Sequence, residues 1–440
     1  MSVGLDTRAS DRTFAGGLPR RALSWSGGPA LALWLVLVSG VHLWGEAINE
    51  RFATKILAPP LTGRFVLHIP PAVLLPIAVA AGIVWFGPRS ARASEWRRLL
   101  VVALLASGAW STSLGLVGGT SSLTAPLEDS HDYLVNVDRV ESPVAFVATY
   151  SEDLSDYSLH AQGHPPGLIL LLWSMDRMGL SGPGPATALI IAAGASVATA
   201  ALVALRAAAG EDRARRAAPF LVLAPAAVWM VTSGDALFAA TSAWGLALLA
   251  LGAQRRSDGL ALAGGGLLGA ALFLTYGVAP LGVVALALAL VHRRTRPLFV
   301  AAVGVAAVVA GFAAAGFWWF DGLDATIGRY ELGVAAQRPF GYFAIANLAA
   351  FALALGPAVA IAFTRLRDGR TWLVVGAALV AVTAADLTGY SKGEVERIWL
   401  VFVPWFLLAC SAFDLNRVRG MLALQAAVAV AIQIGVRTPW

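Results

Sequence analysis

The sequence predicts an all-α protein that crosses a lipid bilayer many times, and three observations lead to this prediction. Hydrophobic residues make up 58% of the 440 residues, charged residues make up only 13%, and the mean hydropathy is +0.72. Ordinary soluble domains carry about 25% charged residues, so this composition excludes a soluble globular fold. Apolar runs of roughly 20 residues, the length that a helix needs to cross the hydrocarbon core, recur along almost the whole chain.

Each predicted span is an apolar run bounded by charged residues, glycine or proline. The segment 168–180 is not counted, because it is short and contains Asp176 and Arg177. We predict that it forms an amphipathic helix at the outer membrane interface, and we make the same prediction for 140–150. Thirteen spans remain, near 30–47, 70–87, 99–119, 184–206, 217–233, 236–253, 258–274, 277–291, 298–319, 343–363, 371–388, 397–412 and 420–436.

Charges divide unevenly between the two sides that these spans define. With a cytoplasmic N-terminus, the inward segments hold 22 of the 32 basic residues and 8 of the 26 acidic ones, and the outward segments hold 10 and 18. This asymmetry follows the positive-inside rule, so we expect a multi-pass protein of the cytoplasmic membrane, with its active site on the extracytoplasmic side. The basic excess then reflects topology, and nucleic acid is not an expected partner.

The outer loop 120–183 departs most from the composition of the chain. It begins with EDSHDYL at 128–134, continues through about thirty mostly polar residues, and ends in HPPG at 164–167 before the apolar segment. Both prolines fix their own backbone, and each also restricts the residue before it, so the HPPG turn holds the chain rigid. For any single acid of this loop, a purely solvated role is the simpler reading. The acids and histidines together predict a site.

These motifs resemble the GT-C glycosyltransferases, and most of all the branch of protein O-mannosyltransferases and aminoarabinose transferases. EDSHDYL after a span and HPPG before an interfacial helix carry the resemblance, together with TSGDALF between two later spans. It covers roughly 99–275 and implies a GT-C-like bundle of about 13 transmembrane helices. The chain then divides into a cytoplasmic tail 1–29, an additional pair of spans 30–98, a catalytic module 99–291, and a C-terminal region 292–440 with outer loops 320–342 and 389–396.

The resemblance implies that Asp129 is the general base that deprotonates an acceptor hydroxyl while a sugar leaves a polyprenyl phosphate. The second acid of the family motif is Ser130 in this chain, so either Asp132 or Glu128 stands in for it or the second acid is not needed. Tyr133 and His164 are expected to bind substrate beside them.

Two further clusters are candidates for substrate binding. Asp235, in TSGDALF, either lines the site or caps the following helix, and both roles are compatible. Lys392 and Arg397 are expected to bind the donor phosphate, near Glu396. The alternative for this cluster is an interfacial anchor. Arg329 is a further possible phosphate contact.

No cofactor is certain. A divalent cation, Mg²⁺ or Mn²⁺, is possible at Asp129, His131 and Asp132.

The function that the resemblance favours is transfer of a sugar from a polyprenyl-phosphate donor to a lipid, glycan or protein acceptor, with membrane lipids as surroundings. The alternative is a transporter or flippase of a lipid-linked intermediate. Against it, ionisable residues crowd the outer loops rather than the centres of the spans.

Overall fold

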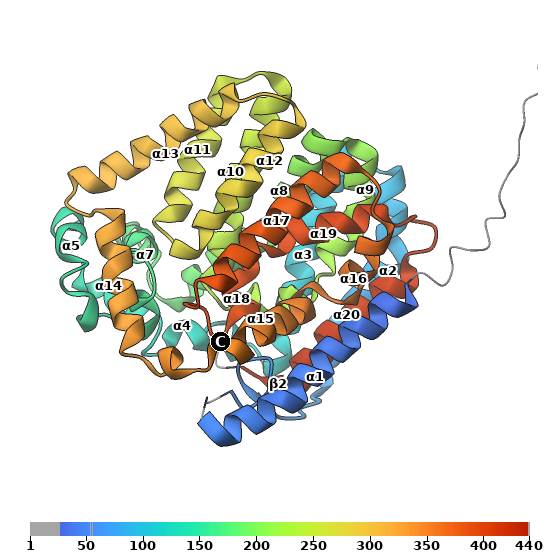
Figure 1. Ribbon diagram of the computed structural model, residues 1–440, viewed down its shortest axis with the longest axis horizontal. Helices are drawn as coiled ribbons and strands as arrows, with labels where there is room; N and C mark the ends of the chain where they lie inside the picture. The colour runs from blue at the N-terminus through green and yellow to red at the C-terminus, as the bar shows by residue number, and fades with distance from the viewer. Residues whose placement is uncertain (1–26, 53, 55, 439–440) are drawn as a thin grey trace, which may run out of the picture.

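The computed structural model describes residues 27–52, 54 and 56–438, and it is an all-α bundle (Figure 1). Residues 1–26 of the predicted cytoplasmic tail lie outside the described part. A single pair of short antiparallel strands occurs in the described chain, β1 (Arg64–Phe65) with β2 (Val436–Arg437). The helices are α1 Gly28–Phe52, α2 Leu74–Ala93, α3 Trp96–Gly115, α4 Ala125–Glu128, α5 Pro143–Thr149, α6 Leu159–Gln162, α7 Gly167–Arg177, α8 Pro183–Ala209, α9 Glu211–Val222, α10 Asp235–Arg255, α11 Asp258–Leu272, α12 Gly282–Val291, α13 Arg296–Ala314, α14 Trp319–Glu331, α15 Phe340–Leu355, α16 Pro357–Arg365, α17 Gly369–Leu387, α18 Val395–Ile398, α19 Val403–Leu407 and α20 Arg419–Gly435.

Seven of the described helices are long and apolar enough to cross a membrane, namely α1, α2, α3, α8, α10, α13 and α17. Two bent pairs raise this number to nine if each pair forms one span. The predicted count of thirteen is therefore not confirmed, although every predicted apolar run falls on helical structure. The runs at 258–274, 277–291 and 420–436 form shorter apolar helices.

The bends explain much of the difference. The helices Phe340–Leu355 and Pro357–Arg365 meet at 90°. Gly356 between them has a φ of 76°, a conformation that favours glycine, and Pro357 then starts the next helix. The predicted span 217–233 is also broken, because α9 ends at Val222 and a separate 3₁₀ turn, η7 (Pro225–Trp229), follows. Hydropathy averaged over a window does not register such breaks.

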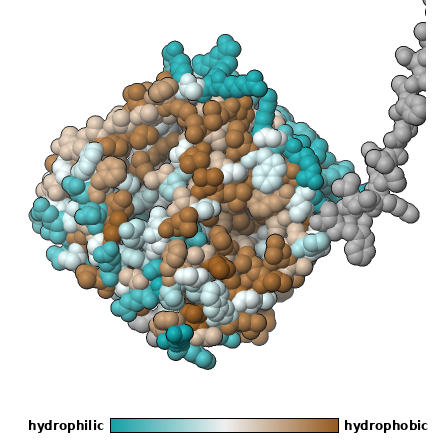
Figure 2. Space-filling model, in the orientation of Figure 1, coloured by the Kyte–Doolittle hydropathy of each residue, from teal (hydrophilic) through white to brown (hydrophobic). Residues whose placement is uncertain are grey.

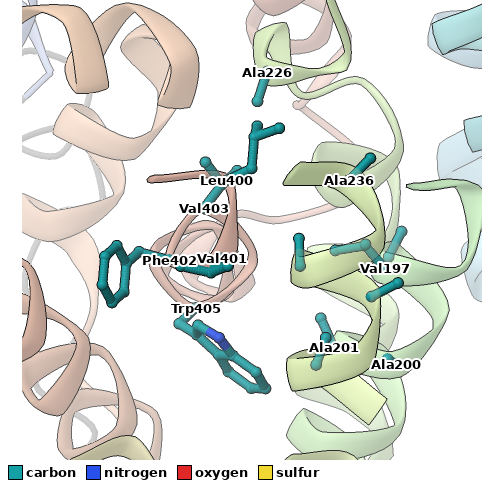
Figure 3. Close-up of a cluster of buried hydrophobic side chains, with 14 of the residues drawn as sticks. Val197, Ala200, Ala201, Ala226, Ala236, Leu400, Val401, Phe402, Val403 and Trp405 are labelled. Carbon is teal, nitrogen blue, oxygen red and sulfur yellow. The ribbon is translucent and has the colours of Figure 1, made fainter. Parts of the chain in front are cut away.

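The core lies between α8, α10 and the segment from α18 to α19. Val197, Ala200 and Ala201 of α8 lie across from the helical segment that carries the buried residues Val403 and Trp405, whereas Phe402 points away from α8 (Figure 3). Many of the contacts between helices are made by alanine, so the backbones approach closely. Apolar side chains also cover much of the outer surface (Figure 2), as expected for helices that contact lipid.

Glycines set the closest contact between helices, that of α11 with α13. A Cβ on Gly265 would lie 1.9 Å from the carbonyl oxygen of Ala301, and a Cβ on Gly304 would lie 2.4 Å from that of Leu262. Small residues let two helices approach closely, and Gly265 has this role, whereas Gly266 faces open space.

We expect Gly265→Ala to lower the free energy of unfolding by about 1–3 kcal/mol, because the added methyl group forces α11 and α13 apart. Gly266→Ala is the matched control and should raise it by roughly 0.5–1 kcal/mol through its higher helix propensity. Titration of both purified variants with SDS measures the difference. Equal stabilities would contradict the assigned packing role.

The loops form two groups, one at each end of the bundle. In the first, the Arg215 guanidinium donates to the carbonyls of Ala91 and Ser94, and Arg213 donates to that of Ser411. These contacts join segments predicted to be cytoplasmic. In the second group, contacts join 54–65, 120–183, 320–342 and 389–396, all predicted to face outward. Loops with the same predicted sidedness are therefore neighbours.

The outer loop 120–183 contains four short helices, α4 to α7. The prediction that 168–180 and 140–150 are helical is confirmed by α7, with 11 residues, and α5, with 7 residues. Both are too short to span a bilayer. The predicted N-terminal pair is built into the bundle, since α1 packs against α15 and α16, and α2 packs against α3, α9 and α20.

Candidate functional site

The beginning and end of the outer loop are tied together around Asp132. This carboxylate is buried, accepts a hydrogen bond from the Tyr133 backbone at 2.7 Å, and lies 3.2 Å from Nδ1 of His160. Asn136 and Ser158 exchange two hydrogen bonds beside it, at 2.7 and 3.0 Å. Asp132 is thus part of the loop framework.

The HPPG turn is anchored on both sides. The Tyr150 hydroxyl donates to the carbonyls of Ala161 and His164, at 2.8 and 3.1 Å. The Gly167 N–H donates to the carbonyl of Phe273 at 2.9 Å, and a Cβ on Gly167 would lie 2.3 Å from that oxygen. The close approach explains why position 167 is glycine.

His164 is buried at the centre of this arrangement. Its Nδ1 lies 2.9 Å from the His160 carbonyl, which only accepts, so Nδ1 carries a proton and donates it. Burial lowers the pKa of His164 below its ordinary value of 6.5, and Asp235 opposes that shift. The imidazole is therefore neutral at pH 7 and leaves Nε2 as an acceptor.

The lowered pKa makes stability depend on pH. Below pH 6.5 the unfolded chain binds a proton at this histidine more readily than the folded protein does. The stability that neutral His164 allows is thus fully present above pH 6.5. It is lost as the pH falls from 6.5 toward the pKa of His164 in the folded protein. We expect the stability of the protein to decline across this range, and His164→Gln to flatten the decline. His68→Gln changes an exposed residue and should leave the decline unchanged. Thermal unfolding at several pH values measures the decline. The same decline in His164→Gln as in the unmodified protein would contradict the role of His164.

A buried ion pair joins two distant parts of the chain. Asp235 and Arg397 are 3% and 5% exposed, and Arg397 Nη1 lies 2.7 Å from Asp235 Oδ2. Arg397 Nη2 also donates to Glu394 at 2.8 Å, and the Ser233 hydroxyl donates to Asp235. Asp235 is the first residue of α10, where the helix dipole favours a negative charge. The Asp235 side chain does not cap α10, because it accepts from Ser233 and Arg397 rather than from a helical N–H, whereas the Ser233 hydroxyl accepts the Asp235 N–H at 3.2 Å.

Tyr133 connects the loop framework to this ion pair. Its buried ring lies 5.7 Å from that of His164, which in turn lies 5.3 Å from Phe238 of α10. Burial raises the pKa of Tyr133 well above its ordinary value, and the nearby charges of Asp235 and Asp132 raise it further. Five predicted site residues therefore form one cluster, which we call the loop–helix cluster: Asp132, Tyr133, His164, Asp235 and Arg397.

Asp129, the expected base, lies outside the buried part of this cluster. It is exposed, as is Glu128. Asp129 Oδ1 accepts hydrogen bonds from the His131 backbone N–H at 2.8 Å and from the His131 ring at 2.6 Å. These bonds hold the pKa of Asp129 below its ordinary value of 3.8, first through the backbone N–H. Asp129 is thus an ionised, accessible carboxylate next to buried residues.

The remaining predicted residues join the outer segments to one another. Lys392 Nζ donates to the carbonyl of Ala336 at 2.9 Å, and Arg329 donates to the side chain of Gln162. Glu396 is fully buried, and its Oε1 accepts the Thr62 N–H at 2.8 Å. All three join segments that are predicted to face outward.

The possible metal site finds no support in the geometry. Asp129 pairs with His131, whereas Asp132 pairs with His160. In residues 27–52, 54 and 56–438, no group of three or more His, Cys, Asp or Glu side chains is arranged to hold a metal ion.

Three contributors were not predicted as site residues. Glu394 pairs with Arg397 three positions later, and this helical spacing is a signal that the sequence contained. His160 pairs with Asp132 across 28 positions, and Asn347 bonds Asp386 and the Gly393 N–H, at 2.8 and 3.1 Å. No local pattern indicates these two.

No family model matches the chain, and neither the curated proteins nor the solved structures include a match to it. The resemblance to GT-C enzymes therefore depends on the quoted motifs alone.

Proposed function

We propose that this protein is an integral membrane glycosyltransferase that moves a sugar from a polyprenyl-phosphate donor to a lipid, glycan or protein acceptor. The observation that carries the proposal is the position of Asp129. It is an ionised and accessible carboxylate three residues before Asp132, and thus at the edge of the loop–helix cluster. Rigid surroundings of this kind hold a base at a fixed position relative to a bound substrate.

The proposed reaction is a displacement at the anomeric carbon. The acceptor hydroxyl oxygen forms a bond to that carbon as Asp129 takes the hydroxyl proton. The bond from the anomeric carbon to the phosphate oxygen breaks, and the polyprenyl phosphate leaves with the electron pair. Asp129 is ionised at neutral pH, since hydrogen bonds from His131 lower its pKa, and the same bonds make it a weaker base than a free carboxylate.

We assign Arg397 a positioning role rather than the phosphate contact expected from the sequence. Its charge is already neutralised by Asp235 and Glu394 in a buried setting. Release of Asp235 would leave an unpaired buried carboxylate, which is costly. Lys392 and Arg329 are half-buried and donate only to neutral oxygens in the described structure, so they are better candidates for the departing phosphate.

The proposed topology keeps the N-terminus in the cytoplasm and loop 120–183 outside, in the cytoplasmic membrane. It keeps thirteen crossings by counting the broken segment 217–233 and the shorter helices α11, α12 and α20 as spans beside the nine found by length and composition. The two groups of loops at opposite ends of the bundle support this arrangement. Labelling of cysteines introduced in loop 120–183 and at the start of α9, residues 211–216, tests which end faces outward.

The transfer reaction is tested directly with purified protein and a panel of radiolabelled polyprenyl-phosphate sugars. Transfer of label from one donor to an acceptor in a membrane extract supports the proposal. A protein that binds none of the donors and transfers none of the sugars contradicts it.

The alternative, a transporter or flippase, has less support from the helices. In α8 the only charged residue is Arg206, in the last turn, and α10 has Asp235 and Arg255 at its two ends. Transport pathways usually place polar groups near the membrane midplane. Movement of a lipid-linked sugar across proteoliposomes without sugar transfer would favour the transporter.

A further inference from the structure

A basic cleft lies at the other end of the bundle, away from the loop–helix cluster. It forms where the turn between α10 and α11 meets the turn between α12 and α13, at the top of Figure 1. Its volume is about 560 Å³, and its walls include Arg256, Arg294 and Arg296 with a single acid, Asp258. Three positive charges against one negative charge leave the cleft with a net charge of two.

The arginines are held in place by distinct contacts. Arg294 Nη1 donates to the carbonyl of Ala253 at 3.1 Å, near the C-terminal end of α10. Arg296 makes a two-pronged pair with Asp258, at 2.6 and 3.1 Å. Arg256 ends α10 with a φ of 56°, a left-handed conformation in which glycine is favoured. An arginine at this position therefore costs backbone stability, and its side chain faces the cleft.

An exposed apolar surface continues below the cleft. Phe299 and Val303 lie four residues apart on one face of α13, and they are 71% and 62% exposed. Leu262 on the neighbouring α11 is exposed as well. In Figure 2 this end of the molecule shows hydrophilic surface above hydrophobic surface. A molecule with a doubly negative head and apolar chains would complement both parts.

We propose that this cleft binds the headgroup of an anionic membrane phospholipid with two phosphate charges, while its acyl chains lie against α11 and α13. Guanidinium groups bind phosphate oxygens through charge-assisted hydrogen bonds. Basic pockets between helices at a membrane surface are suited to such headgroups. Cardiolipin, with two phosphodiester groups, has the matching charge and serves as the probe.

The chain offers a matched pair of variants for the test. Arg256→Gly and Arg293→Gly each remove one arginine from this end of the bundle, and each relieves a left-handed residue, since Arg293 has a φ of 53°. Of these two arginines, only Arg256 lines the cleft. Loss of surface charge and change in backbone strain are therefore the same in both, and only the contact with the headgroup differs.

The full-length protein in phosphatidylcholine nanodiscs with a small fraction of cardiolipin provides the measurement, read by native mass spectrometry of the retained lipid. We expect Arg256→Gly to weaken cardiolipin retention about tenfold and Arg293→Gly to leave it nearly unchanged. Equal losses in the two variants would overturn the proposal, because general surface charge would explain them. Two further results would also overturn it, namely equal retention of phosphatidylglycerol at matched total charge and displacement of cardiolipin by millimolar inorganic phosphate.

Discussion

Arg397→Met is expected to lower the free energy of unfolding by about 3–5 kcal/mol, the largest effect of any single change at the site. The substitution leaves Asp235 buried beside the start of α10 without its cationic partner. A buried, unpaired carboxylate destabilises the folded state by its lost hydration, unless it becomes protonated. Titration of the purified protein with SDS measures the loss.

Two controls separate this effect from a general loss of arginine. Arg216→Met breaks the pair of Arg216 with Asp212, which has the same chemistry but lies largely in solvent, and it should cost less than about 1 kcal/mol. The double variant Asp235→Leu with Arg397→Met removes both buried charges, so it should be more stable than Arg397→Met alone. A double variant that is less stable than the single one would contradict the account of an unpaired charge.

Asp129→Asn is expected to reduce sugar transfer by about 10²- to 10⁴-fold while the protein folds and inserts normally. The amide cannot accept the acceptor proton, yet it keeps the size of the side chain. Folding should be unaffected because Asp129 is exposed and its partners belong to the same turn. Transfer of radiolabelled sugar from the donor identified in the panel is the measurement, and Glu128→Gln is the control because Glu128 is an exposed acid one residue earlier. Full activity in Asp129→Asn would remove Asp129 from the mechanism.

The pH dependence of transfer gives a second test of this role. The pKa of Asp129 is below 3.8, so the base stays ionised at pH 5 and transfer should not decline through loss of this carboxylate until lower pH. His131→Ala removes the ring hydrogen bond to Asp129, so the acidic limb of the rate profile should move upward toward pH 3.8. An acidic limb above pH 5 that is unchanged in His131→Ala would indicate a different base.

The sequence by itself determined the class of the protein, the positions of its apolar helices, and the presence of the short helix that became α7. These properties depend on local composition, because a helix satisfies its backbone hydrogen bonds within one segment and its hydropathy is a property of that segment. The sequence also located the HPPG turn, since proline restricts the chain wherever it occurs.

Only the tertiary structure decided which charged residues meet. Asp235 and Arg397 are 162 positions apart, and nothing near either residue indicates that one neutralises the other. The fold brought Asp132 to His160 and left Asp129 with His131, although the two aspartates are three residues apart. It also bent α15 against α16 by 90° and broke the run at 217–233, so that long apolar runs became fewer straight spans. Pairing depends on packing between distant segments, and hydropathy read along the chain contains no information about such contacts. The bend occurs at Gly356 and Pro357, a local break that hydropathy averaged over a window does not register.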